Sequence, residues 1–123
     1  MQKRLRYLNL FAIRLPLPGV LSILHRVSGV LLIIALPAAL AALQCSVSDA
    51  AGYERTVALL SHPLGKLVTW GIVWAFLHHL CAGLRFILLD FHIGTDLAAA
   101  RRSTVVAFVV SIALTLLFGV WLW

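Results

Sequence analysis

The sequence predicts an all-α integral membrane protein, a single domain over residues 1–123 built as a bundle of three transmembrane helices. Two observations lead there. First, 63% of the 123 residues are hydrophobic and 11% are charged, whereas soluble domains carry about 45–50% apolar and about 25% charged residues. Second, the apolar residues gather in three stretches, over about 20–43, 64–89 and 104–123. Each meets the roughly 20 residues that a helix needs to cross about 30 Å of hydrocarbon.

The first stretch follows two prolines, Pro16 and Pro18. Proline is poorly tolerated inside a helix, so we expect an approach segment there and a helix that starts at Gly19 or Leu21. Pro37 lies within the stretch and predicts a kink, which membrane helices tolerate. We expect a loop over residues 44–63 before the second stretch begins.

Basic residues predict the orientation of the three spans. The net charge is +6, and the basic residues cluster before or at the start of the first span (Lys3, Arg4, Arg6, Arg14 and Arg26) and in the second loop (Arg101 and Arg102). The first loop carries Asp49, Glu54 and Arg55 and is slightly acidic. Lys and Arg gather on the cytoplasmic side of membrane proteins, so the N-terminus is expected inside and Trp121 and Trp123 at the outer interface. This placement favours membrane lipid as the partner of the charge and argues against nucleic acid.

The sequence carries no common catalytic or metal-binding signature. It contains no helical HExxH zinc motif, no P-loop, no dinucleotide fingerprint and no GxSxG. The two cysteines, Cys45 and Cys81, form no CxxC, and we expect them at different depths and unpaired. His62 and His92 are expected in solvated loops.

A first polar cluster interrupts the start of the first span. Ser22, His25, Arg26 and Gly29 are spaced three, four and seven residues apart, so they share one face of a helix. That face carries a hydroxyl, an imidazole and a guanidinium just inside the inner membrane surface. Snorkelling toward headgroups explains Arg26 alone, and a binding site explains the whole stripe. The residues by themselves leave both interpretations open.

A second cluster lies in the second span. His79 falls about ten residues from its inner end, or roughly 15 Å at 1.5 Å per residue, with Gly83 one turn below. An imidazole can ligate haem iron, and a glycine lets a flat macrocycle approach the backbone. The alternative is a histidine that hydrogen-bonds a neighbouring helix, which the residues alone favour. His78 points about 100° away and is expected to hydrogen-bond a partner helix.

The two clusters are predicted to converge. The first span enters from inside and the second returns to inside, so the Ser22/Arg26 face and Arg85 share the inner half of the membrane. His79 lies just beyond.

Both clusters resemble the signatures of one family. Residues 22–29 are similar to its S-x-x-H-R-x-[ST]-G motif, and residues 79–90 are similar to an H-x-x-x-G-x-R-[HF] stretch that ends in Asp. The family is the cytochrome b membrane-anchor subunit of succinate dehydrogenase (complex II), the large C-type anchor. The resemblance covers almost the whole chain.

The resemblance implies roles for individual residues. His79 would be one axial ligand of a b-type haem shared with a second anchor subunit. Ser22 and Arg26 would help form the ubiquinone site, and His25 and Arg26 would lie near the haem propionates. Arg85 and Asp90 would hold the inner end near the iron–sulfur subunit. Phe86 stands where many members have a second histidine, so any role of that histidine is lost.

The same resemblance implies a setting and a mechanism. Succinate would be oxidised in a flavoprotein subunit, and electrons would pass through the iron–sulfur subunit to ubiquinone in the respiratory chain and tricarboxylic acid cycle. This chain would lie in the bacterial inner (cytoplasmic) membrane as a multi-pass subunit with no activity alone. Two alternatives remain. One is a fumarate reductase-type anchor that works with a quinol, and the other is a small cofactor-free membrane protein with a structural or transport role.

Overall fold

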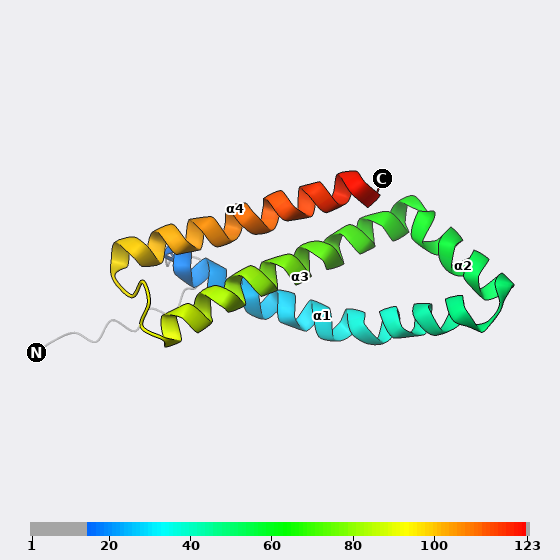
Figure 1. Cartoon of the computed structure of the whole chain (residues 1–123), viewed down its shortest axis with the longest axis horizontal. Coiled ribbons are helices and arrows are strands. Elements are labelled where there is room, and N and C mark those ends of the chain that lie inside the picture. The colour runs from blue at the N-terminus through cyan, green and yellow to red at the C-terminus, as the bar shows by residue number, and fades with distance from the viewer. Residues whose placement is uncertain (1–14, 123) are drawn as a thin grey trace, which may run out of the picture.

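Four helices account for most of the chain (Figure 1). A computed structural model describes residues 15–122. The helices are α1 (Leu17–Ser48), α2 (Ala50–Ser61), α3 (Pro63–Asp90) and α4 (Leu97–Leu122). The helices α1, α3 and α4 are long and apolar enough to cross a membrane, and no strand occurs within the described residues. The predicted all-α fold with three membrane helices is confirmed. The basic residues Lys3, Arg4, Arg6 and Arg14 and the expected belt residue Trp123 lie outside the described residues.

Helix α1 is longer than predicted at both ends. It begins at Leu17, with Pro16 as its N-cap and Pro18 in the first turn, so the expected start at Gly19 or Leu21 is wrong. Proline is tolerated there because the first N–H groups of a helix have no acceptor within it. The helix then continues through Pro37 as far as Ser48.

The expected loop over residues 44–63 contains a helix instead, the twelve-residue α2. The side chain of Asp49 accepts a hydrogen bond from the Gly52 N–H and caps the start of α2. His62 separates α2 from α3. Its backbone N–H donates to the Ala58 carbonyl, and its Nδ1 accepts from the Leu64 N–H at 3.2 Å. His62 is exposed, as predicted, and it also caps a helix.

Helix α3 lies between α1 and α4 and contacts both (Figure 1). α1 crosses α3 near its own N-terminal end and then diverges from it toward α2. α4 presents small side chains at intervals of three or four residues to the interior, namely Thr104, Ala107, Ser111, Thr115 and Gly119. Small residues let two membrane helices approach closely. Most large apolar side chains are exposed on the outside of this thin bundle, as a lipid-facing surface requires.

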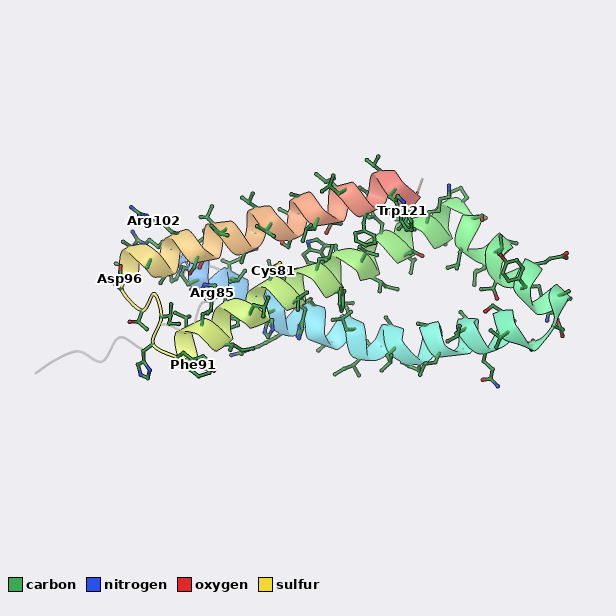
Figure 2. All side chains as sticks on the ribbon, viewed as in Figure 1. Cys81, Arg85, Phe91, Asp96, Arg102 and Trp121 are labelled. Carbon is green, nitrogen blue, oxygen red and sulfur yellow. The ribbon has the colours of Figure 1, made fainter. Side chains whose placement is uncertain are left out.

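The start of α1, the end of α3 and the start of α4 lie at one end of the molecule. Figure 2 shows Arg85, Asp96 and Arg102 toward this end and Trp121 at the other. The turn between α3 and α4 uses two residues of positive φ, His92 at 61° and Gly94 at 72°. Asp96 then caps α4 by accepting from the Ala99 N–H at 3.0 Å. Arg101 and Arg102, which were expected in the second loop, lie in the first two turns of α4 instead. The start of α4 and the start of α1 share one end of the molecule, as the orientation argument requires. Both cysteines are free, as predicted.

Candidate functional site

The two polar clusters meet where α1 crosses α3. The imidazole rings of His25 and His79 are stacked, with centroids 4.1 Å apart and planes 15° from parallel. The ring of Phe86 stands edge-on to His25 at 5.2 Å. The predicted convergence of the two clusters is therefore observed for His25 and His79.

Hydrogen bonds fix the orientation of the His79 ring. Its Nδ1 lies 3.1 Å from the backbone carbonyl oxygen of His25 and 3.3 Å from Oγ of Ser28. A carbonyl oxygen can only accept, so Nδ1 of His79 must carry the hydrogen. In the neutral imidazole, Nε2 then holds the free lone pair. This is the tautomer in which Nε2 can coordinate a metal.

Gly29 of α1, to which the sequence argument gave no such role, makes room for the His79 ring. A Cβ atom built on Gly29 of α1 would lie 3.0 Å from Cε1 of His79. A Cβ atom on Gly83 would lie 3.5 Å from Nε2 of His25, which is an ordinary contact. The close approach to His79 thus comes from the facing helix. Gly83, one turn below His79 on its own helix, faces His25 instead.

Ser22 and Arg26 lie on the flank of α1, beside the surface that packs against α3. Ser22 is half-buried and Arg26 is exposed, whereas Leu21 and Ser28 on the same helix are fully buried. Among residues 15–122, neither side chain has a hydrogen-bond or ion-pair partner. The structure therefore leaves both groups accessible beside the two histidines rather than in contact with His79.

His78 points to the other side of α3. It is 1% exposed and lies between the rings of Trp74, at 5.2 Å, and Phe108 of α4, at 5.5 Å. Its Nε2 has no hydrogen-bond partner within the described part of the chain. The expected hydrogen bond to a partner helix is thus not observed, and aromatic packing surrounds the ring instead.

Arg85 joins α3 to α4. It is buried, its Nε donates to Oγ of Ser103 at 3.0 Å, and its Nη2 donates to the Ala100 carbonyl at 3.2 Å. Figure 2 shows its side chain between the two helices. These bonds hold the inner ends of α3 and α4 together, and the expected place of that end near the iron–sulfur subunit stays a prediction. Asp90, at the end of α3, is exposed.

Sequence reasoning gave no role to Ser28, which the structure brings to the centre of the site. Ser28 is fully buried and donates its hydroxyl hydrogen to the His25 carbonyl at 2.8 Å. It lies seven residues after the buried Leu21, on the same helix face, and that spacing was the available signal. Which atom of His79 it meets depends on how α1 and α3 cross.

Comparison with known proteins agrees with the geometry. Residues 2–118 match the family described as succinate dehydrogenase/fumarate reductase transmembrane subunit. The chain belongs to this family. A relative from Coxiella burnetii (strain RSA 493 / Nine Mile phase I) is 34% identical over 122 residues, which is 98% of either chain. A relative from Paracoccus denitrificans is 28% identical over 104 residues, which is 85% of this chain and 80% of the relative. Both are named succinate dehydrogenase cytochrome b556 subunit.

Membership of this family establishes what kind of protein the chain is. It is a cytochrome b-type membrane subunit of the succinate dehydrogenase family, a multi-pass membrane protein whose complex is an oxidoreductase. The resemblance seen in the residues 22–29 and 79–90 is confirmed.

Proposed function

We propose that this chain is an anchor of succinate dehydrogenase in a bacterial inner membrane, with its N-terminus inside. It forms a single domain that holds one side of a haem b through His79 and contributes Ser22 and Arg26 to a ubiquinone-reduction site. The flavoprotein and iron–sulfur subunits bind at its inner end, and a second anchor subunit supplies the other haem ligand. Both named relatives belong to succinate dehydrogenases, which favours this direction over fumarate reduction.

The state of the His79 ring carries the proposal. Its Nδ1 is bound to the His25 carbonyl, as is usual for histidines that ligate metals, where the second nitrogen donates to a carbonyl or carboxylate. A merely structural histidine could make the same bond. However, no residue among 15–122 hydrogen-bonds to Nε2 of His79, and the ring is only partly buried. A partly exposed ring with no hydrogen bond at Nε2 from the described residues supports ligation.

The donor set fits haem better than a bare metal ion. No group of three or more His, Cys, Asp or Glu residues that could hold an ion occurs in the described residues. Haem iron needs only axial ligands from the protein, and one imidazole per anchor subunit is enough. A haem held by His79 would supply a one-electron centre near the middle of the membrane.

The quinone site is proposed on the flank of α1. Arg26 is an exposed guanidinium one turn from the Ser22 hydroxyl, and both are donors. They suit a quinone oxygen, because a hydrogen bond from a charged group strengthens as negative charge develops on the acceptor. His25 and Arg26 are also proposed to meet the haem propionates, where positive charge is favourable.

An optical experiment tests the proposal. The complex is purified through a tag on this chain, and difference spectra are recorded after succinate and then after dithionite. We expect a b-type haem band, which His79→Ala abolishes or strongly perturbs. His92→Asn is the control, because His92 is exposed, has positive φ and lies in the α3–α4 turn. An unchanged band in His79→Ala would refute the ligand assignment. Wild-type preparations without haem under either reductant would favour the cofactor-free alternative.

A further inference from the structure

The hydroxyl of Ser28 shares the N–H of His79 with a backbone carbonyl. Ser28 is fully buried, and its O–H donates to the His25 carbonyl at 2.8 Å. The hydroxyl hydrogen of Ser28 is therefore used in that bond. Its oxygen can still accept a hydrogen bond from Nδ1 of His79, 3.3 Å away. The same Nδ1 lies 3.1 Å from the His25 carbonyl. One N–H therefore faces two acceptors that are themselves joined by a hydrogen bond.

Gly29, the residue after Ser28, limits where the His79 ring can lie. Gly29 leaves just enough space for Cε1 of His79, since a Cβ atom there would come within 3.0 Å. The Ser28 hydroxyl and the Gly29 backbone therefore act on adjacent atoms of one ring. Residues 25–29 of α1 form a cradle that sets both the tautomer and the tilt of the imidazole.

We propose that Ser28 is a positioning residue for His79, and that through the Nδ1–H it adjusts the electron density at Nε2 and hence the potential of the haem iron. This inference rests on the proposed ligand role of His79. Acceptors at the far nitrogen of a ligating imidazole raise its basicity. A more basic axial ligand favours the oxidised iron, and second-shell hydrogen bonds are one of the means by which a protein sets haem potential. Loss of the Ser28 oxygen should make the His79 imidazole less basic and therefore raise the reduction potential of the haem iron.

The test uses the assembled complex carrying Ser28→Ala, with the haem titrated against potential by absorbance. We expect haem content near that of wild type. The ratio of reduced to oxidised haem at a fixed potential should rise by up to about tenfold, which corresponds to 59 mV for a one-electron couple. Ser28→Thr keeps the hydroxyl and should restore a value close to wild type.

A matched control exists on α4. Ser111 is also fully buried and also donates to the carbonyl three residues earlier, that of Phe108, at 3.0 Å. It has no hydrogen bond to a histidine within the described residues. Ser111→Ala thus removes an equivalent hydroxyl and should leave the haem potential unchanged.

The outcomes separate the two proposals. If His79→Ala keeps a wild-type haem spectrum, the ligand assignment fails and this inference fails with it. If His79→Ala loses haem but Ser28→Ala titrates like wild type, or like Ser111→Ala, only the Ser28 role is overturned. Should Ser28→Ala not assemble, Ser28→Cys replaces it, because a thiol is close in size and a weak acceptor. A wild-type potential in that variant would likewise overturn the inference.

Discussion

The ring of His25 stacks on the ring of His79, yet it is the backbone carbonyl of His25 that binds Nδ1 of His79. The side chain of His25 thus packs against the His79 ring, while its main-chain carbonyl accepts the hydrogen bond from that ring. Alanine at position 25 removes the stacked ring and leaves the carbonyl in place.

We therefore predict that His25→Ala weakens haem binding without abolishing it. A stacked ring pair contributes about 0.5–1.5 kcal/mol, whereas His79→Ala removes the proposed ligand itself. Haem content per assembled complex, measured as the pyridine haemochrome, should stay well above that of His79→Ala. Equal loss in the two variants would mean that the side chain of His25 is as necessary as the ligand.

Arg26→Leu tests the quinone site. We expect quinone reduction to slow by roughly tenfold or more, the factor for a lost hydrogen bond to a charged group. Succinate oxidation with a soluble artificial dye should change little, since it bypasses the quinone. Arg102→Leu, an exposed arginine at the same end of the bundle, is the control. A parallel loss in both assays would instead indicate a defect in assembly.

The link between Arg85 and Ser103 should stabilise the α3–α4 pair. Ser103→Ala leaves the buried Nε of Arg85 without its partner at 3.0 Å. Hydrogen bonds between membrane helices contribute about 0.6–1.7 kcal/mol, so thermal dissociation of the complex should begin at a lower temperature with an unaltered haem spectrum. Ser46→Ala is the control, since that half-buried serine bonds only the Leu43 carbonyl of its own helix among the described residues. Equal stability of the two variants would contradict a stabilising role for the link.

At the other end of the same helix pair, the indole of Trp70 packs on Gly119. A Cβ atom on Gly119 would lie 2.7 Å from Nε1 of Trp70, which itself donates to the Thr115 carbonyl at 3.1 Å. Gly119→Ala should displace the indole and lower the thermal stability of the complex. Gly71→Ala should not, because a Cβ atom there meets nothing within 4 Å. An indole fluorescence spectrum that is the same in Gly119→Ala and wild type would count against the displacement.

Cysteine labelling tests the orientation in the membrane. In a background with Cys45→Ser and Cys81→Ala, Tyr53→Cys on α2 and Thr95→Cys in the α3–α4 turn present exposed thiols at opposite ends. The positive-inside rule predicts that an impermeant maleimide reaches position 53 in intact spheroplasts and position 95 only after permeabilisation. The reverse pattern would invert the proposed topology.

Hydropathy alone was enough to predict the fold class, because whether a segment spans a membrane depends on its own length and apolar composition and not on contacts with other segments. The stretches at 20–43, 64–89 and 104–123 each became a helix, although α1 gained residues at both ends and α4 begins at Leu97 rather than at 104. Helix α2 was missed because it is short, and its start depends on the cap made by Asp49. The residue pattern likewise sufficed to single out His25 and His79 and to place them on facing helices.

Only the tertiary structure decided which atoms meet. Whether His79 turns toward Ser28, which glycine frees its ring and whether Arg85 faces α4 or a partner all depend on the rotation and crossing of two helices. The periodicity of one helix gives its faces but not the height or angle at which another helix crosses them. For that reason the sequence singled out His25 and His79, while the packing of α1, α3 and α4 decided the contacts that they make and brought Ser28 to them.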